Sequence, residues 1–233
     1  MTVSVDDMAV LLTGVGKRYD IVSAFAQHAT VVAADPNPLA PAQYAAHHRF
    51  SVPRIEDPEY VPTLAALCEQ YGARAVVPLT DLDLEVLGQA RVDGLLPAFV
   101  PDPEIARATF DKYEAHLLLE RLALPSPPTV LPGDPVEHFP VMVKPRWGSG
   151  ARSIHRADDA RAAEFLVDYI AEPAMVQRYM DGPEFSMDVL CDLHGRCLNV
   201  IPRTMIESRK SQRTSIENSG PSMKRCTIVG SRM

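Results

Sequence analysis

The sequence is poor in the residues that mark several specialised classes of protein. It has four cysteines, Cys68, Cys191, Cys197 and Cys226, and their spacing fits neither a metal site nor a disulfide framework. We therefore expect free thiols and a cytoplasmic location. No apolar run approaches the ~18 residues that a membrane-spanning helix needs. The N-terminus is acidic and lacks a basic segment, so we do not expect a signal peptide there.

Positive charge is also scarce. The 23 Lys and Arg residues face 30 Asp and Glu residues, which gives a net charge of −7. The arginines are scattered until about residue 208, so the sequence predicts no basic face for a nucleic acid. Hydrophobic residues make up 46% and charged residues 23%, as in ordinary soluble proteins. A chain of 233 residues is long enough for one large domain or two small ones.

The first hundred residues alternate short apolar runs with helical patterns. Five runs predict strands, at 9–13, 30–34, 49–52, 74–78 and 98–100. The spacing of apolar residues predicts helices at 19–27 and 60–71, the second stopped by Gly72. Strands that alternate with helices indicate a mainly parallel open sheet, in which ligands bind beyond the carboxyl ends of the strands.

Two features near those strand ends allow alternative interpretations. Gly14-Val-Gly16 followed by Asp35 partly matches a dinucleotide-binding fingerprint, although Tyr19 replaces the third glycine. Asp35 is alternatively the cap of the turn at 36–38. The carboxylates Asp81, Asp83 and Glu85 either bind a metal or charge the first turn of a helix, where the helix dipole favours them.

Residues 101–103 are rich in proline and predict a domain boundary. Helices are expected at 103–109 and 111–122, with Leu117, Leu118 and Leu122 in the core, followed by an extended connector at 124–130. Strands are then expected at 141–144, 153–155, 175–177, 184–190 and 197–201, with a helix at 158–170 capped by Asp158 and Asp159. The predicted fold class is therefore α/β in the first half and α+β in the second.

The segment from Pro140 to Ile154 carries the clearest chemical signal. Lys144 ends an apolar run, and Gly148-Ser149-Gly150 follows it. Two glycines around a serine let backbone N–H groups turn toward one anion, which predicts a lid over phosphates. The alternative is a β-hairpin with a long glycine turn and a solvated lysine. The lysine precedes the glycines and no helix follows them directly, so this is not the P-loop pattern.

Three features in order extend that signal: Lys112 at a helix start, Lys144 to Gly150, and Gln177-x-x-Met180-x-x-x-Glu184. Together they resemble the ATP-grasp superfamily, and in particular proteins similar to the large subunit of carbamoyl phosphate synthase. The resemblance implies a Rossmann-like pre-ATP-grasp domain at 1–102. A partial ATP-grasp module follows at 103–206, with the lid and the start of the C-terminal subdomain.

The resemblance also implies roles for individual residues. Lys112 and Lys144 match the family lysines that contact the ATP phosphates, and Gly148, Ser149 and Gly150 match the loop that closes over them. Gln177 would read the adenine amino group, the Met180 backbone would meet the ring, and Glu184 would hold the ribose hydroxyls. Three methionines either form an apolar slot for the purine or belong to an ordinary core, namely Met142, Met175 and Met180.

The end of the sequence departs from the family pattern. The magnesium ligands of the family, an acid and then Glu-x-Asn, are not found, and Glu217-Asn218 lacks the intervening residue. We therefore interpret 207–233 as an atypical tail, from truncation or a frameshift. Magnesium is expected for the family, but its ligands are not identified in this chain.

The resemblance implies an ATP-dependent carboxylate–amine or carboxylate–thiol ligase that works through an acyl phosphate. Its partners would be ATP and a small carboxylate, with neither nucleic acid nor membrane, and a homo-oligomer is kept as an open alternative. Two other hypotheses stand beside it. One is a non-catalytic nucleotide-binding fragment, and the other is a dinucleotide-dependent oxidoreductase built on Gly14 and Gly16.

Overall fold

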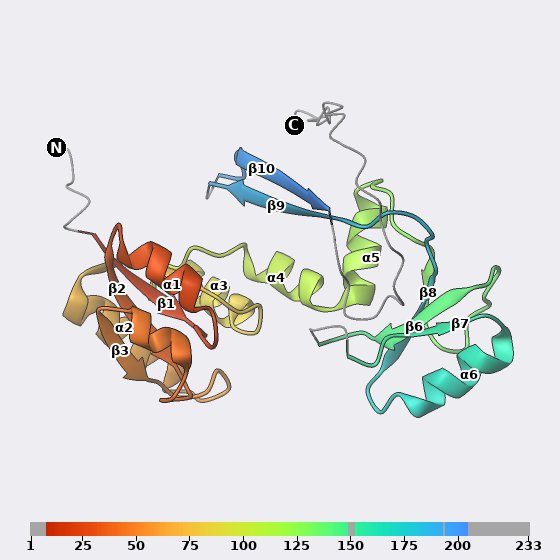
Figure 1. Cartoon of the computed structure of the whole chain (residues 1–233), viewed down its shortest axis with the longest axis horizontal. Helices are drawn as coiled ribbons and strands as arrows, with labels where there is room; N and C mark the ends of the chain where they lie inside the picture. The colour runs from red at the N-terminus through yellow and green to blue at the C-terminus, as the bar shows by residue number, and fades with distance from the viewer. Residues whose placement is uncertain (1–7, 149–151, 193, 205–233) are drawn as a thin grey trace.

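A computed structural model describes residues 8–148, 152–192 and 194–204. A parallel sheet with its helices lies at one end of the molecule and a smaller antiparallel sheet at the other, with two helices between them (Figure 1). The predicted mixture of helices and strands is confirmed. None of the helices in these residues is long and apolar enough to cross a membrane.

The N-terminal sheet contains four parallel strands in the order β3-β2-β1-β4. The strands are β1 (Ala9–Thr13), β2 (Thr30–Asp35), β3 (His48–Ser51) and β4 (Ala73–Pro78). The helices are α1 (Tyr19–Ala26), the 3-10 helix η2 (Pro41–Ala45), α2 (Tyr60–Tyr71) and α3 (Leu84–Val92). The four strands, α1 and α2 lie within a few residues of their predicted bounds, whereas no bounds were predicted for η2 or α3.

Both faces of this sheet are covered, because helices pack on each side of it. Leu11 of β1 joins Leu64 of α2 and Leu87 of α3 in one cluster, whereas Leu12 joins Val22 of α1 in the other. All five residues of β1 are buried. Burial on two faces explains why the strands read as continuous apolar runs without alternation.

The strand expected at 98–100 was wrong in extent. Ala98 makes a single parallel bridge to Val76 of β4. Two backbone hydrogen bonds hold it, from Val76 to Pro97 and from Phe99 to Val76. The chain then turns away at the prolines that precede the next helix, so no longer ladder forms.

Two short helices follow the N-terminal sheet. They are α4 (Pro103–Phe110) and α5 (Lys112–Arg121), and Asp111 between them caps α5 by accepting hydrogen bonds from the backbone of Tyr113 and Glu114. Leu122 was wrongly predicted to lie in the core: it follows the end of α5 and is exposed. His116 is the buried side chain of this helix instead, whereas Leu117 and Leu118 are only partly buried.

The second sheet is antiparallel, in the order β5-β8-β6-β7, and α6 covers one face of it. Its elements are β5 (Thr129–Val130), β6 (Val141–Pro145), β7 (His155–Ala157), α6 (Ala160–Tyr169) and β8 (Ala174–Arg178). Asp159 caps α6, as predicted, by accepting from the backbone of Ala162. The returning strand starts at His155 rather than Ser153, because Ser153 adopts a positive φ of 52° that does not fit a strand.

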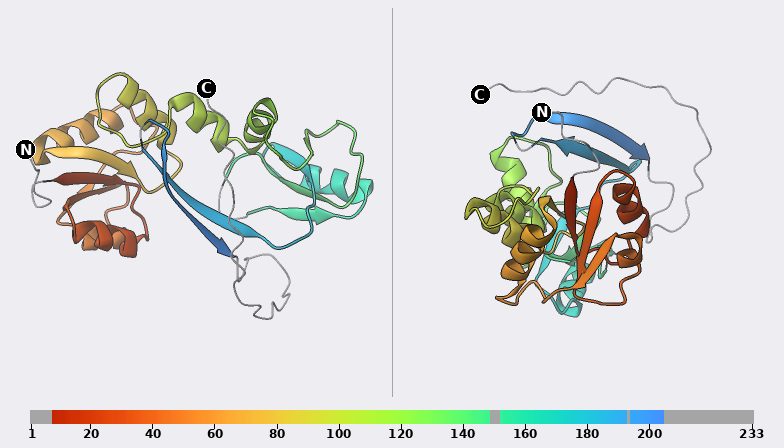
Figure 2. Two further views of the ribbon diagram at one scale, coloured as in Figure 1. Left: turned by 90° about the horizontal axis from the view of Figure 1, so that it is seen from above. Right: turned by 90° about the vertical axis from the view of Figure 1, so that its left-hand side faces the viewer.

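Strands β9 (Phe185–Cys191) and β10 (Cys197–Thr204) form a separate hairpin. It extends from the end of β8 back above α4 (Figures 1 and 2). Within the described residues these strands pair only with each other, and most of their side chains are exposed on both faces. Cys68, Cys191 and Cys197 are free thiols, and Cys226 lies outside the described residues.

Candidate functional site

Strand alternation places Lys144 and Gln177 on the same face of the second sheet. Along β6, Val141, Val143 and Pro145 are buried, so the residues between them face the other way. The register pairs Met142 with Gln177 and Lys144 with Met175, so these four residues share the other face of the sheet. The Lys144 ammonium donates a hydrogen bond of 2.8 Å to Oε1 of Gln177. The face opposite α6 therefore carries the two polar side chains that the sequence singled out.

Lys112 reaches the same region from the first turn of α5. Its ammonium donates to the carbonyl of Gly148 at 2.8 Å and to that of Arg146 at 3.2 Å. Its backbone N–H also donates to the carbonyl of Arg146 at 2.9 Å. Lys112, 34 residues before Arg146 in sequence, is thus attached to the start of the glycine segment.

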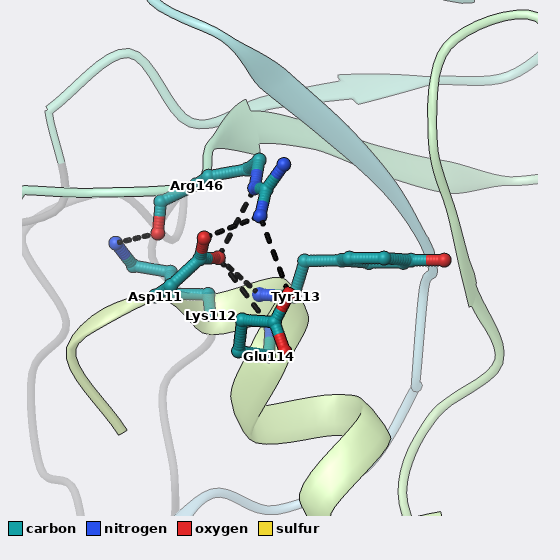
Figure 3. Close-up of polar contacts among 5 residues, drawn as sticks. All are labelled: Asp111, Lys112, Tyr113, Glu114 and Arg146. Atoms are coloured by element: carbon teal, nitrogen blue, oxygen red, sulfur yellow. Dashed lines mark hydrogen bonds and ion pairs between the residues drawn. The ribbon is translucent and has the colours of Figure 1, made fainter. Parts of the chain in front are cut away.

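Arg146 and Asp111 hold this junction together (Figure 3). The Arg146 guanidinium donates to both carboxylate oxygens of Asp111, from Nε at 3.1 Å and also from Nη2. It also lies 3.8 Å from the carboxylate of Glu114 and stacks over the ring of Tyr113. No motif in the sequence marked this pairing of Arg146 with Asp111.

The two lysines lie in an electropositive and partly dehydrated place. Burial lowers the pKa of Lys144, and the nearby charge of Lys112 lowers it further. Burial also lowers the pKa of Lys112, although Asp111 and Asp81 act in the opposite direction. For Asp111, burial alone would raise the pKa, but the hydrogen bonds from Arg146 and the Tyr113 backbone bring it below its ordinary value. Two ammonium groups that repel each other favour a bound polyanion.

Gln177 has a second partner that the sequence analysis did not identify. Its Nε2 donates to the hydroxyl of Thr129, which lies directly opposite it on β5, at 2.9 Å. Thr129 is buried, with 8% of its surface exposed. Only the prediction of an extended connector at 124–130 touched this residue, and no motif marked it.

Of the other residues predicted to bind ATP, one lies beside the lysines, two lie outside the described residues, and two lie after β8. Gly148 contacts Lys112 through its carbonyl, whereas Ser149 and Gly150 lie outside the described residues. Met180 and Glu184 follow β8 and are exposed. Among the described residues, no hydrogen bond joins either side chain to the lysines. The structure thus brings together Lys112, Lys144, Gly148 and Gln177, and leaves Met180 and Glu184 on the segment that leads to β9.

The three methionines do not form one slot. Met175 is fully buried, whereas Met142 is half-buried and Met180 is 60% exposed. Met175 fits the alternative interpretation of an ordinary core residue. Met142 stands beside Gln177 in the register and remains a candidate contact for a flat ring.

At the N-terminal sheet, the groups of the partial dinucleotide fingerprint bind each other. Gly16 donates its N–H to one oxygen of Asp35 at 2.8 Å, and Asn37 donates to the other oxygen at 2.9 Å. Asp35 is thus the cap of the following turn, as its alternative interpretation predicted. Gly14 has a φ of 57°, and a Cβ there would lie 2.5 Å from Cγ2 of Thr80. Close packing explains this glycine without a phosphate.

Asp83 is the most deeply buried carboxylate of the candidate acidic group. It is fully buried, and one of its oxygens accepts hydrogen bonds from Thr13 at 2.7 Å and from Tyr60 at 2.8 Å. The other oxygen has no partner among the described residues. Burial raises the pKa of Asp83, against the effect of the two hydroxyl donors.

The acidic group does not gather around one point. Asp81 is exposed, and Glu85 in the first turn of α3 pairs with Arg107 at 2.8 Å. Nowhere in residues 8–148, 152–192 and 194–204 do three or more His, Cys, Asp or Glu side chains form a group that could hold a metal ion. The helix-start interpretation therefore fits Glu85, whereas the Asp83 side chain makes no cap hydrogen bond to α3 and instead accepts from Thr13 and Tyr60.

Residues 109–227 match the family described as the ATP-grasp domain. The chain belongs to the ATP-grasp family. That match includes Lys112, Lys144 and Gln177, the polar residues whose side chains the fold brings together, and Gly148 beside them. Residues 10–94 match the family described as the PylC-like N-terminal domain. The predicted likeness to the large subunit of carbamoyl phosphate synthase stays a prediction.

Solved structures share this ATP-grasp fold at low identity. An N5-carboxyaminoimidazole ribonucleotide synthetase from Thermotoga maritima matches with 18% identity and a TM-score of 0.65, over 85% of this chain and 54% of that chain. An L-amino acid ligase from Bacillus licheniformis matches with 18% identity and a TM-score of 0.61, over 78% and 47%.

A biotin carboxylase domain of a Hydrogenobacter thermophilus 2-oxoglutarate carboxylase, in complex with MgADP and bicarbonate, matches with 19% identity and a TM-score of 0.60, over 83% of this chain and 48% of that chain. The chain thus spans about half the length of each of these three solved structures. No curated protein sequence gives a match.

Proposed function

We propose that this ATP-grasp chain binds ATP at the face of the second sheet that carries Lys144 and Gln177. The observation that supports the proposal is the convergence of Lys112, Lys144, Gly148 and Gln177 from three separate segments of the sequence. In this proposal Ser149 and Gly150 complete the phosphate loop, and Met180 and Glu184 contact the base and the ribose.

The residue types suit a nucleoside triphosphate. Lys144 and Lys112 supply two ammonium groups, and their mutual repulsion falls when phosphate charge lies between them. The Lys112 ammonium donates hydrogen bonds to carbonyls at the start of the glycine segment. Contact with phosphate would replace those carbonyls and thereby couple the loop to the nucleotide. Glu184 has two acceptor oxygens for the two ribose hydroxyls.

We further propose a ligase of the carboxylate–amine or carboxylate–thiol type, in which the carboxylate is activated as an acyl phosphate. The family match and the similarity to an L-amino acid ligase support this class. The partners would be ATP and a small carboxylate, in the cytoplasm, and a homo-oligomer stays an alternative. Positioning of the reactants and neutralisation of charge carry most of such chemistry, so Lys112 and Lys144 need not act as bases.

Magnesium is expected for this class, but among the described residues no three or more His, Cys, Asp or Glu side chains gather into a candidate metal site. We therefore assign no ligand for the ion and derive no step through it. The expected magnesium motif is not found in the sequence after residue 206. We therefore propose that this 233-residue chain binds ATP but hydrolyses it only slowly. Sustained phosphate release from this chain with a panel of amino acids would contradict that proposal.

The deciding experiment is a calorimetric titration of the chain with ATP and with NAD at equal concentrations. We expect ATP to bind, and we expect the affinity for NAD to be far lower. Lys144→Met should weaken ATP binding by about 1.5–3 kcal/mol, the scale of a charged hydrogen bond. Lys17→Met is the matched control, because Lys17 is exposed and follows Gly16 in the N-terminal loop.

Three outcomes separate the hypotheses. Binding of NAD without ATP would overturn the proposal and favour the dinucleotide hypothesis. ATP binding that Lys144→Met leaves unchanged would remove Lys144 from the site. ATP binding without phosphate release under any condition would favour the non-catalytic nucleotide-binding protein.

A further inference from the structure

Thr129 makes two hydrogen bonds that together constrain its neighbour Gln177. The hydroxyl lies 2.8 Å from the carbonyl oxygen of Pro127 and 2.9 Å from Nε2 of Gln177. Thr129 is buried at the β5 edge of the sheet and pairs with Gln177 in the antiparallel register. Because Thr129 is buried and its hydroxyl is bonded on two sides, it can fix the orientation of the Gln177 amide.

The direction of each hydrogen bond follows from counting protons. A threonine hydroxyl has one proton, and the Pro127 carbonyl can only accept, so that proton belongs to Pro127. Toward Gln177 the hydroxyl therefore offers only a lone pair. The Gln177 amide must turn its NH₂ group to Thr129 and its Oε1 to the opposite side.

Lys144 supports the same orientation from the other end. Its ammonium has donors only, and it lies 2.8 Å from Oε1 of Gln177. In the proposed function, however, this ammonium turns to the phosphates when a nucleotide binds. The Thr129 hydroxyl is held by its hydrogen bond to the Pro127 carbonyl, and this bond does not depend on a bound nucleotide. With a nucleotide bound, Thr129 is thus the described residue that still orients the amide.

We propose that Thr129 is a positioning residue that makes the site select adenine over bases with a carbonyl at the same ring position. This inference rests on the proposed function, in which Gln177 faces the base. An oriented Oε1 accepts a hydrogen bond from the amino group of adenine, whereas it faces another acceptor in guanine or hypoxanthine. Without Thr129 the amide can rotate by half a turn and offer NH₂ to that carbonyl.

The test measures the dissociation constants of ATP, GTP and ITP for the full 233-residue chain and its variants. Thr129→Val keeps the shape of the side chain and removes the hydroxyl, and Thr129→Ala removes it without adding an apolar contact. We expect the preference for ATP over GTP and ITP to fall about five- to tenfold in both variants. Thr129→Ser retains the hydroxyl and should restore the preference.

A matched control is Thr109→Val. The Thr109 hydroxyl also donates to a backbone carbonyl, that of Ile105 at 2.8 Å, but it lies on α4 away from Gln177. This variant should keep the wild-type ratio. The ratio separates positioning from general damage, because partial unfolding weakens all three nucleotides by the same factor.

The outcomes distinguish this inference from the proposed function. If the wild-type chain binds no ATP, the proposed function fails and the inference fails with it. If the wild type binds ATP and a folded Thr129→Val or Thr129→Ala variant keeps the same base preference, the role of Thr129 is wrong and the proposed function stands. A lower preference in either variant, recovered in Thr129→Ser, supports the inference.

Discussion

Arg146 and Asp111, 35 residues apart in the sequence, form a two-point ion pair that joins the end of β6 to the start of α5. The same Asp111 carboxylate caps α5 through the backbone of Tyr113. Lys112 is the next residue, and it binds the carbonyl of Arg146 with both its backbone N–H and its ammonium. The position of one proposed phosphate lysine therefore depends on the segment that carries the other.

Replacing Arg146 should loosen this junction. Arg146→Ala leaves the buried Asp111 carboxylate without its guanidinium partner, and we expect the chain to lose about 1–3 kcal/mol of stability. ATP binding should weaken, though less than in Lys144→Met, because Lys112 is displaced and not removed. Urea unfolding and calorimetric titration measure the two effects.

The control for that variant is Arg107→Ala. Arg107 pairs with Glu85 on the surface, with both side chains largely exposed, so its loss should cost less than about 1 kcal/mol. Equal stability losses in the two variants would show that the Arg146–Asp111 pair has no special role.

The affinity for ATP should fall as the pH rises and Lys144 loses its proton. This fall should begin at a lower pH than it would for a lysine with an ordinary pKa. Burial and Lys112 lower the pKa of Lys144 from its ordinary value of 10.5. Bound phosphates favour the protonated form, so binding takes up a proton once the pH approaches this lowered pKa. Titrations across pH 7 to about 10 in buffers of different ionisation enthalpy measure the uptake. A pH profile that is the same in Lys144→Met would contradict this assignment.

Asp83 should make the chain less stable as the pH rises above the acidic range. Its pKa is raised by burial in the folded state, so the folded protein binds this proton more tightly than the unfolded chain does. The contribution of Asp83 to stability is therefore fully present below the unfolded value of 3.8 and is lost as the pH rises through the folded pKa. In Asp83→Asn this contribution to the slope should vanish.

Thermal unfolding of the wild type and Asp83→Asn, followed by circular dichroism from pH 4 to about 8, tests that slope. Tyr60→Phe is a useful companion, because it removes one of the two hydroxyl donors to Asp83. It should destabilise the chain by about 1–3 kcal/mol, since a buried acceptor loses a hydrogen bond. Parallel pH profiles of wild type and Asp83→Asn would count against the raised pKa.

Gly88 on α3 should not tolerate a methyl group. A Cβ at this position would lie 3.2 Å from the carbonyl oxygen of Pro101 and 3.2 Å from the nitrogen of Pro103. Both are backbone atoms, one just before α4 and one in its first residue, so α3 or the start of α4 would have to move by a few tenths of an ångström. We expect Gly88→Ala to cost about 1–3 kcal/mol, as overpacked sites do.

Gln89→Ala is the comparison for Gly88→Ala, because Gln89 lies on the exposed side of the same helix and bonds only Asp93 nearby. Its effect should stay within about 0.5 kcal/mol. If Gly88→Ala and Gln89→Ala were equally stable in the same denaturant titration, the backbone at Pro101 and Pro103 would be able to move away from the added methyl group without cost.

Much of the fold followed from local patterns. The parallel strands are continuous apolar runs such as 9–13, and α6 begins after Asp159, the cap that the sequence indicated. The prediction failed where the outcome depends on distant partners. The strand expected at 98–100 shrank to one bridge, and Leu122 is exposed because the chain leaves α5 there.

The sequence by itself determined the chemical inventory at the Lys144 segment: a lysine on a strand, two glycines after it, and Gln177 on a later strand. Composition, strand alternation and the order of motifs are local properties, so they could be identified without coordinates. Tertiary structure decided which side chains meet.

The pairing of Arg146 with Asp111 and of Thr129 with Gln177 joins residues 35 and 48 positions apart. Such contacts arise from the packing of α5 and β5 against the sheet, which local sequence patterns do not encode. Lys144 was identified as a candidate from the sequence, but only the structure showed that Lys144 and Thr129 form hydrogen bonds with opposite ends of the Gln177 amide.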